Sequence, residues 1–460
     1  MDTKKLRQKI LDLAIHGKLV PQDPNDEPAS VLLERIRAEK ERLIAEGKIK
    51  RSKKSATSDT SHYENVAEGW VLTDIGELLI NRDSERVPLS LGVRSKQENK
   101  IYDYYGATGV VDKVDGYLFD ERLLLIGEDG ANLLSRSKDN AFFAEGKYWV
   151  NNHAHILDCP EKEVLDYVAF LINSMSLEDY ITGSAQPKLN QDNLNKIEIP
   201  LPPLEEQRRI IAQVNLWQNY IQDLEASEIE LKESVESAKS KILDLAIHGK
   251  LVPQDANDEP ASELLKRINP KAVASCDNPH YEQVPFEIPS NWLWVKLGDI
   301  TNYGKCSTCS VDDINNESWI LELEDIEKDT GRVLVRHSKA EREIKGVRHS
   351  FYAGNILYSK LRTYLNKVLV AKEDGFCTTE IIPIECCDSV HPDYICNILR
   401  SKYFLDYTAQ CGYGVKMPRL STTDARKALI PLPPYKEQIR ISEKIDVLMG
   451  ALNAIVETLV

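Results

Sequence analysis

Two pairs of cysteines are the first residues whose type and spacing would suit metal chemistry. Cys306 and Cys309 have the spacing of a zinc knuckle, and Cys386 and Cys387 are the other close pair. A structural zinc site takes four ligands, usually as two spaced pairs, and adjacent cysteines chelate one ion poorly. We therefore expect reduced structural thiols rather than a zinc centre at these positions.

Three shorter patterns also resemble reactive sites. His153 and His155 would point to one face of a strand, but the sequence identifies no carboxylate partner, so we expect core or surface histidines. Residues 277–281 (DNPHY) lack the second proline of the adenine-methyltransferase signature, and no glycine-rich strand–turn–helix accompanies them. Glu343 and Lys345 match part of a nuclease carboxylate–lysine pattern, which short segments match by chance.

No phosphate-binding loop accompanies these residues. Each Gly-Lys pair in the chain is followed by a residue other than Ser or Thr, whereas a P-loop needs one of these hydroxyls for its metal ion. We find no catalytic constellation, so we expect a non-catalytic chain that binds no metal and no cofactor of its own.

Basic side chains indicate a different kind of chemistry, the binding of nucleic acid. Between residues 331 and 372 there are ten Lys or Arg against two Glu, although the whole chain has a net charge of -15. Such a local excess of positive charge is typical of a phosphate-binding surface, and a solvated charged face is the alternative. The candidate DNA contacts in this run are Lys345, Arg348, Lys360, Arg362, Tyr364 and Lys367.

Composition limits the broad class of protein. The 460 residues are 42% hydrophobic and 28% charged, as in ordinary globular proteins, and the acidic balance argues against a sequence-independent nucleic-acid coat. No apolar run approaches the roughly 20 residues of a membrane helix, and the nine cysteines follow no disulfide framework. We expect a cytoplasmic protein of about two to four domains with no membrane partner.

An internal repeat organises the elements that must position these side chains. Residues 9–23 (KILDLAIHGKLVPQD) recur letter for letter at 241–255, an offset of 232 residues. PLPPLEEQRRI from Pro200 is matched by PLPPYKEQIRI from Pro431, an offset of 231 residues. The chain therefore consists of two copies of one module, each of about 230 residues.

A heptad pattern follows both copies of the second motif. Apolar residues alternate spacings of four and three from Ile210 to Leu245, interrupted only by Glu228, which predicts a coiled-coil helix of about five heptads. The same spacing resumes at Ile441 near the end of the chain. The expected seam residues, for helix pairing and subunit docking, are Ile210, Val214, Trp217, Ile221, Leu224, Leu231, Val235, Ile441, Ile445 and Leu448.

The second copy of the long helix is divided between the two ends of the chain. Its start lies after Pro431, and its last turns lie at the N-terminus. We infer that the two pieces lie end to end, antiparallel to the central helix, so that the modules have a cyclic order and pseudo-twofold symmetry. Two unrelated amphipathic helices are the alternative. Gly17 and Gly249, each after a histidine, are the expected helix C-caps.

The blocks between the repeated motifs, roughly 75–180 and 297–412, share almost no identity with each other. Strand-like runs at 122–127 and 355–360, with turn residues nearby, favour a mixed α/β (α+β) domain for each block. The expected boundaries are an N-terminal helical region (1–47), a basic linker (48–60), a first variable domain (61–199), the central helix and its arm (200–275), a second variable domain (276–430) and the C-terminal helix (431–460).

The repeated motifs resemble those of a known family. PLPPLEEQ and PLPPYKEQ, each followed by heptads, look like the specificity subunit of type I restriction–modification systems, as do GSAQPKLN and KILDLAIHGKLVPQD. In the divergent blocks, YYGATGVVDKVDGYLF, KYWVNNHAHIL, NILYSKLRTYLNKV and GFCTTEIIPI are similar to the target-recognition domains of that family. The resemblance covers essentially the whole chain.

This resemblance implies a DNA-recognition subunit. Each target-recognition domain would bind one half of a split site in double-stranded DNA, and the helices would set the gap and dock two methyltransferase subunits. Restriction and translocase subunits would complete an ATP-dependent nuclease, with S-adenosylmethionine, ATP and magnesium bound to these partners. The loops that resemble the family's stretch near the DNA contain Gln186, Lys188 and Asn190 in the first copy and Lys416 and Arg419 in the second.

Two other classes of function stay open at the level of sequence. A pseudo-symmetric protein–protein scaffold would also carry two variable domains on constant helices, and the net charge of -15 agrees with it. A stand-alone methyltransferase or nuclease is disfavoured by the missing motifs. No residue code links these blocks to particular bases or to a gap length.

Overall fold

The chain folds into two compact units, Met1–Ser227 and Glu228–Val460. The computed structural model describes residues 2–49, 63, 66–183, 186–272, 284–414 and 417–458, so most of the expected basic linker lies outside the described residues. Each unit combines a mixed α/β domain with helices, which confirms the expected fold class. None of the described helices is both long and apolar enough to cross a membrane.

The first unit contains two helices before its sheets and the start of a long helix after them. In chain order its elements are α1 (Thr3–Ile15), α2 (Ala29–Ala45), β1 (Val71–Asp74), α3 (Ile75–Leu78), β2 (Ile80–Asn81), η1 (Asp83–Glu85), α4 (Leu91–Arg94), β3 (Tyr102–Gly106), β4 (Gly109–Val114), β5 (Phe119–Asp120), β6 (Leu123–Gly127), α5 (Asn132–Ser135), β7 (Ala141–Ala144), β8 (Lys147–Val150), β9 (Ala154–Asp158), α6 (Val164–Ser174), η2 (Glu178–Tyr180), α7 (Gln191–Asn195), β10 (Glu198–Leu201) and α8 (Leu204–Ile247), which continues into the second unit.

The second unit repeats this plan. Its described elements after α8 are α9 (Ala261–Ile268), β11 (Leu293–Lys296), α11 (Leu297–Ile300), β12 (Thr308–Ser310), η3 (Val311–Asp313), β13 (Trp319–Leu321), η4 (Leu323–Asp325), β14 (His337–Ser338), β15 (Val347–Phe351), β16 (Ile356–Ser359), η5 (Thr363–Leu365), β17 (Val368–Val370), β18 (Gly375–Cys377), β19 (Ile381–Ile384), α12 (Pro392–Arg400), α13 (Lys402–Cys411), α14 (Thr422–Lys427), β20 (Leu429–Leu432) and α15 (Tyr435–Glu457).

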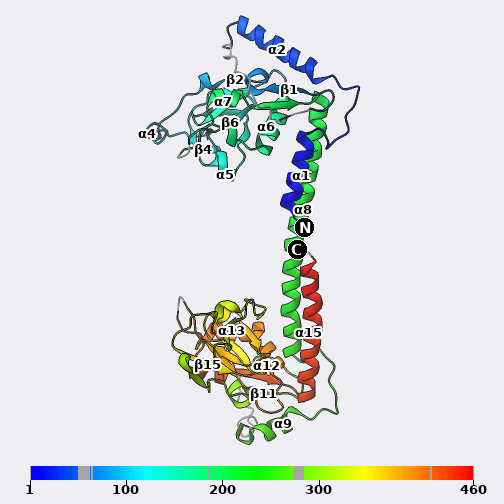
Figure 1. The fold of residues 1–460 in the computed structure, drawn as a ribbon, viewed down its shortest axis with the longest axis vertical. Helices are drawn as coiled ribbons and strands as arrows, with labels where there is room; N and C mark the ends of the chain where they lie inside the picture. The colour runs from blue at the N-terminus through cyan, green and yellow to red at the C-terminus, as the bar shows by residue number, and fades with distance from the viewer. Residues whose placement is uncertain are drawn as a thin grey trace. The chain divides into compact units, whose positions relative to one another are not determined.

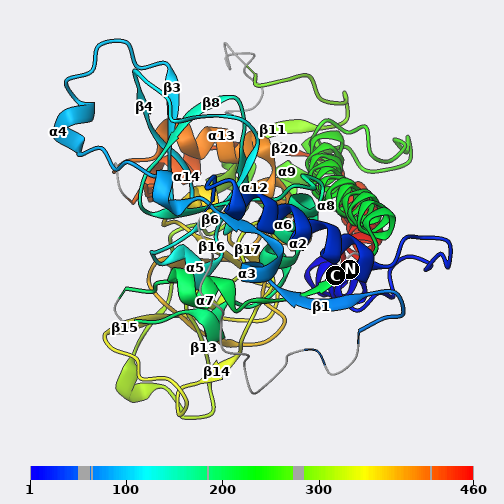
Figure 2. The same cartoon turned by 90° about the horizontal axis from the view of Figure 1, so that it is seen from above.

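Small sheets form the body of each domain. In the first unit the orders are β2-β9-β6-β7, β4-β3-β8-β5 and the pair β1-β10, and α4 projects beyond these sheets in both views (Figures 1 and 2). In the second unit the orders are β12-β15-β18-β13-β14, β17-β16-β19 and the pair β11-β20. Strands β6, β16 and β19 are buried along their whole length, which explains why two of them, β6 and β16, could be recognised as apolar runs.

Each domain contains a central sheet of the same topology, although the sequences of the two domains do not match. The antiparallel strands β9-β6-β7 correspond to β19-β16-β17, and α6 or α12 packs on them. The pairing of Ile126 with His155 in the first domain corresponds to that of Tyr358 with Ile382 in the second. This correspondence identifies equivalent positions in the two domains.

One helix packs antiparallel to each part of α8, as predicted. In the first unit α1 lies alongside the beginning of α8 (Figure 1), where Ile10 shares the core with Val214 and where Arg7 contacts Glu225 at 2.9 Å. In the second unit Ile441 of α15 shares the core with residues at the end of α8. Each part of the predicted split helix therefore packs on α8 within its own unit.

Three of the predicted seam residues are not buried against a partner helix. Trp217, Leu224 and Leu231 are 37%, 47% and 39% exposed. Their exposure has a geometric reason, because one partner helix covers one side of α8 and leaves the alternate heptad positions at the surface. Leu448 is half-buried, and the buried seam residues are Ile210, Val214, Ile221, Val235, Ile441 and Ile445.

The repeated 15-residue segment ends a helix in both units. The N–H of Gly17 donates to the carbonyl of Ala14 over 3.3 Å, and the N–H of Lys18 donates to that of Leu13 over 2.8 Å. This pair of bonds is a Schellman motif, which requires a left-handed residue, and Gly17 has a φ of +65°. Gly249 ends α8 in the same way with a φ of +66°. Both glycines therefore stop their helices, as expected.

Candidate nucleic-acid interface

The PLPP motif joins the first variable domain to the long helix. The indole N–H of Trp70 donates to Oε2 of Glu206 over 3.0 Å, and the side-chain amide of Gln207 donates to the carbonyl of Pro202 over 2.8 Å. Glu206 and Gln207 are both 1% exposed, and burial raises the pKa of the Glu206 carboxyl. The E-Q pair of the motif is therefore a buried anchor between domain and helix.

The second unit repeats this anchor contact by contact. Trp292 donates to Oε2 of Glu437 over 3.1 Å, and the amide of Gln438 donates to the carbonyl of Pro433 over 3.0 Å. The repeated letters thus encode a constant mounting for two domains that differ. An ion pair beside each anchor is also repeated, as Arg209 with Asp26 (2.5 Å) and Arg440 with Asp258 (2.6 Å).

In the second unit, a hairpin lies against the end of β16. The hairpin, of which residues 413–414 and 417–421 are described, closes through backbone hydrogen bonds between Tyr413 and Arg419. The N–H of Arg362 donates to the carbonyl of Pro418 over 2.7 Å, and Lys360 accepts from the N–H of Leu420 over 3.0 Å. Two candidate segments that lie far apart in the sequence, 360–364 and 417–421, are thereby brought together.

Several side chains at this junction are available to a ligand. Tyr364, Tyr413 and Met417 are 59%, 58% and 48% exposed. Within the described part of the chain, no ion pair engages Lys360 or Arg362. Cations without an acidic partner beside exposed tyrosines are suited to phosphates and base edges. Lys416, another candidate, lies outside the described residues.

The other basic candidates of the second unit are engaged by the protein itself. Arg348 is 7% exposed and pairs with Glu322 at 2.6 Å, so the prediction that it faces DNA is wrong. Its charge is needed in the core to balance that carboxylate. Lys367 donates to a backbone carbonyl at 2.6 Å, exposed Lys345 pairs with Glu343 at 3.1 Å, and Arg419 pairs with Glu380 at 3.1 Å. The free positive charge is therefore smaller than the sequence run suggested.

The first unit has the same junction at the end of β6. Its hairpin, of which residues 182–183 and 186–190 are described, closes between Thr182 and Lys188, and the N–H of Leu189 donates to the carbonyl of Glu128 over 2.8 Å. Gly130 donates to the carbonyl of Pro187 over 3.0 Å, as Arg362 does to Pro418 in the second unit. Glu128 is therefore equivalent to Lys360, and Gly130 to Arg362.

The three candidates in this first hairpin have different surroundings. Gln186 is exposed, and Lys188 pairs with Glu128 at 3.1 Å. Asn190 caps α7, because its side chain accepts from the N–H of Asn193 over 2.9 Å. Asn190 therefore has a structural role, while Gln186 and Lys188 are exposed, and their contact with DNA stays a prediction.

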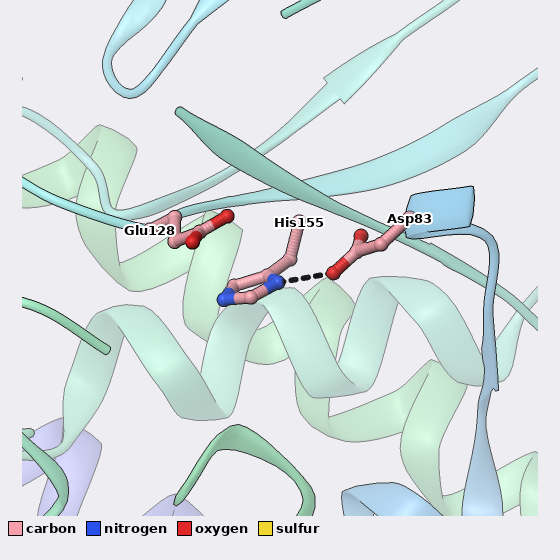
Figure 3. Close-up of side chains that lie close together, drawn as sticks. All are labelled: Asp83, Glu128 and His155. Carbon is pink, nitrogen blue, oxygen red and sulfur yellow. Dashed lines mark hydrogen bonds and ion pairs between the residues drawn. The ribbon is translucent and has the colours of Figure 1, made fainter. Parts of the chain in front are cut away.

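A buried ionic cluster beneath this hairpin was missed by the sequence analysis. His155 and Asp83 lie side by side with Glu128 nearby (Figure 3), and the imidazole Nδ1 is 2.5 Å from a carboxylate oxygen of Asp83. His153 also has a carboxylate partner, Asp129 at 2.8 Å, which the sequence did not identify. The histidine spacing was visible in the sequence, but β-pairing alone brings Asp83 beside them.

The cluster does not have the character of a metal centre. Among the described residues, Asp83, Glu128 and His155 are the group of potential ligands that lie close together. Both ring nitrogens of His155 contact protein oxygens, and Arg86 and Lys188 already supply positive charge to the carboxylates. This donor set fits an internal ion network.

The described cysteines have the surroundings of structural thiols. Cys306, Cys309, Cys386 and Cys387 are free, and burial raises the pKa of Cys386 to about 12. A thiol with a raised pKa is a poor nucleophile and a poor metal ligand at neutral pH.

The chain is similar to known proteins in both sequence and fold. Residues 67–233 match the family model described as the type I restriction modification DNA specificity domain. The type I restriction enzyme EcoAI specificity subunit of Escherichia coli is 26% identical over 98% of this chain and 89% of that protein. The EcoEI specificity subunit of the same species is 27% identical over 96% of this chain and 88% of its own length.

Solved structures share the fold. The HsdS subunit from Thermoanaerobacter tengcongensis aligns with a TM-score of 0.50 at 16% identity, over 87% of this chain and 94% of that one. A chain from a study of complex assembly and conformational transition of the type I R-M system aligns with a TM-score of 0.55, also at 16% identity, over 86% of this chain and 94% of that one.

Proposed function

This chain is a member of the specificity-subunit family of type I restriction–modification systems, and from this premise we propose that it reads a two-part DNA sequence for a multi-subunit complex. Specificity subunits are non-catalytic, and they act with DNA and other subunits. Each variable domain is then a target-recognition domain for one half of the site. This agrees with the missing catalytic motifs in the sequence.

The observation that carries the proposal is the junction found in both domains. In each, a hairpin lies against the end of the central buried strand, and the residues at equivalent positions differ in charge and size. Lys360 and Arg362 in the second domain occupy the positions that Glu128 and Gly130 occupy in the first. A constant framework with different side chains at one place is what two readers of different half-sites need.

The long helix has a surface for another protein. In the first unit α8 exposes a row of apolar side chains, Leu216, Trp217, Tyr220 and Leu224, each at least 37% accessible. Contiguous exposed aromatic and aliphatic groups are typical of protein interfaces. We assign this row to one of two methyltransferase subunits. S-adenosylmethionine, ATP and magnesium would bind to methyltransferase and restriction subunits, not to this chain.

The test is DNA binding by the complex of this chain with its methyltransferase subunits. The probe is a duplex that contains the site found by mapping methylated adenines in a genome carrying the system. We expect Lys360→Ala with Arg362→Ala to weaken binding by about tenfold or more and to lower the slope of log K against log salt by about two, because two phosphate contacts are lost.

Matched control substitutions are available in the same domain. Arg336→Ala with Lys345→Ala also removes two exposed cations, but each is paired with a glutamate of its own, Glu373 and Glu343. This control should bind like the unsubstituted complex. An equal loss of DNA affinity in both double variants would contradict the assigned contacts. DNA binding that does not depend on salt concentration would favour the protein–protein scaffold.

A further inference from the structure

The ring of His155 is held between two oxygens. Its Nδ1 is 2.5 Å from Oδ2 of Asp83 and its Nε2 is 2.7 Å from the carbonyl oxygen of Leu189, while the side chain is 1% exposed. A carboxylate and a carbonyl are both acceptors, so each ring nitrogen must donate a proton. The contacts are therefore satisfied together only by the doubly protonated, positively charged ring.

Charged groups from every neighbouring segment complete the cluster. Arg86 lies 3.3 Å from Asp83 and 2.6 Å from Glu128, and Lys188 lies 3.1 Å from Glu128. Three cations therefore face two carboxylates, with the surface pair of His153 and Asp129 alongside. Although burial opposes ionisation, the bonds from His155 and Arg86 hold the pKa of Asp83 and of Glu128 below their ordinary values. The cluster is ionised and internally paired.

The cluster and the adjoining backbone hold the first hairpin on the domain through hydrogen bonds to both the N–H and the carbonyl of Leu189. The N–H of Leu189 donates to the carbonyl of Glu128, and the carbonyl of Leu189 accepts from His155. The neighbouring Lys188 is tied to the carboxylate of Glu128. Buried, fully paired polar contacts of this kind restrict a loop to one position.

In the second domain, an aliphatic residue replaces the histidine of this cluster. The position equivalent to His155 is Ile382, and the position equivalent to Glu128 is Lys360. The N–H of Leu420 still donates to the carbonyl of Lys360 over 3.0 Å, so one of the two backbone contacts is kept. The chain thus contains its own reference domain with an aliphatic side chain in place of the histidine.

We propose that His155 is a positioning residue for DNA recognition by the first domain, acting as a cationic clamp that sets the place of residues 186–190 in the first hairpin. The proposal rests on the proposed function, since it assigns this hairpin to the DNA. His155 itself is buried and touches no ligand; it acts through Leu189 and Lys188. The second domain is independent of it.

The test uses the complex with its methyltransferase subunits and three duplexes. One duplex carries the mapped site, and each of the other two has one half-site scrambled. The informative variant is His155→Ile, which copies the second domain. We expect it to lose about tenfold or more of the discrimination against the duplex with a scrambled first half-site, and to keep full discrimination at the second half-site.

A conservative variant distinguishes positioning from bulk stability. His155→Gln keeps one N–H donor for the carbonyl of Leu189, so we expect it to restore most of the discrimination lost in His155→Ile. First-half discrimination that is unchanged in His155→Ile overturns the proposal, as does equal loss at both half-sites. If His155→Ile fails to assemble, Asp83→Asn decides, because it removes the carboxylate partner of Nδ1 and must lower first-half discrimination relative to second-half discrimination. An unchanged ratio overturns the clamp.

The two proposals fail in different ways. If the unsubstituted complex does not distinguish the mapped duplex from either scrambled one, the proposed function itself is wrong. If it distinguishes both, but His155 variants leave the first half-site unaffected, only the clamp is wrong.

Discussion

Arg362 shows how a single residue connects backbone strain with a proposed role. It has a φ of +52°, and the equivalent residue of the first domain, Gly130, has a φ of +106°. Glycine adopts such angles freely, whereas a residue with a side chain there costs on the order of 1–2 kcal/mol. An arginine kept in a strained conformation beside a surface hairpin supports a role for its guanidinium group in binding.

At the same scale, the buried carboxyl of Glu437 makes stability depend on pH. Burial raises the pKa of Glu437 above its ordinary value of 4.5, so the folded chain keeps the proton to higher pH than the unfolded chain does. The stability that this group contributes is complete below pH 4.5 and is lost as pH rises through the raised pKa.

We therefore expect the thermal stability of the unsubstituted chain, relative to Glu437→Gln, to decline as pH rises from about 4.5 towards neutrality. The measurement is the difference in Tm between the two proteins at a series of pH values. Glu443→Gln, at an exposed position of the same helix, is the matched control and should show no such trend. A Tm difference that grows with pH would contradict the argument.

At the scale of elements, the end of α8 depends on one glycine. Gly249 has a φ of +66°, and a Cβ there would lie 2.3 Å from Cγ of Pro289 and 3.2 Å from the ring of Trp292. The helix stop, the following loop and the anchor tryptophan therefore form one packed unit. The same holds for Gly17, whose Cβ would meet Ala67 and Trp70.

Gly249→Ala should destabilise the second unit by about 1–3 kcal/mol, because it combines an unfavourable φ with a steric clash. Gly450→Ala is a suitable comparison, since that glycine lies inside α15 at an exposed position and its Cβ would meet nothing within 4 Å. We expect this second change to stabilise the helix by about 0.5–1 kcal/mol. Thermal unfolding of both variants checks the sign of each effect, and a destabilised Gly450→Ala would refute the packing argument.

At the scale of the whole molecule, a repeated helical framework carries two different domains. The anchors, helix ends and ion pairs are the same in both units, while the junctions near the hairpins differ in charge. Under the proposed function, this division would separate the residues used for assembly from those that select DNA. Assembly and recognition should therefore be separable by mutation.

Trp217→Glu tests this separation. Trp217 lies at the surface of α8 with its ring against Tyr220, so its replacement should change folding stability by no more than about 0.5 kcal/mol. Loss of an aromatic group from the centre of an interface should weaken assembly with a methyltransferase subunit by about 30-fold or more. Light scattering and titration of the mixed subunits measure this, with Asn219→Glu, an exposed polar position nearby, as the control. Normal assembly of Trp217→Glu would remove the apolar row from the proposed interface.

Much of the helical framework was predictable because the sequence motifs that form it occur twice in the chain. The repeat, the long helix, the two glycine stops and the antiparallel helix packing all follow from local patterns with a fixed period. Residues such as Ile210, Val214 and Ile441 were identified correctly because burial follows helical spacing. The family resemblance rested on these same repeated letters, and the comparisons confirm it.

The junctions were decided by tertiary structure alone. Backbone hydrogen bonds bring Lys360 beside Leu420, and strand pairing places Asp83 against His155, although more than 50 residues separate each pair. The same folding buried Arg348 against Glu322 and left Trp217 exposed, because partner positions depend on which surfaces meet. Helical period and repeated letters are local properties that a chain carries in its order of residues. The charge and burial of a side chain among distant neighbours exist only once the sheets have formed.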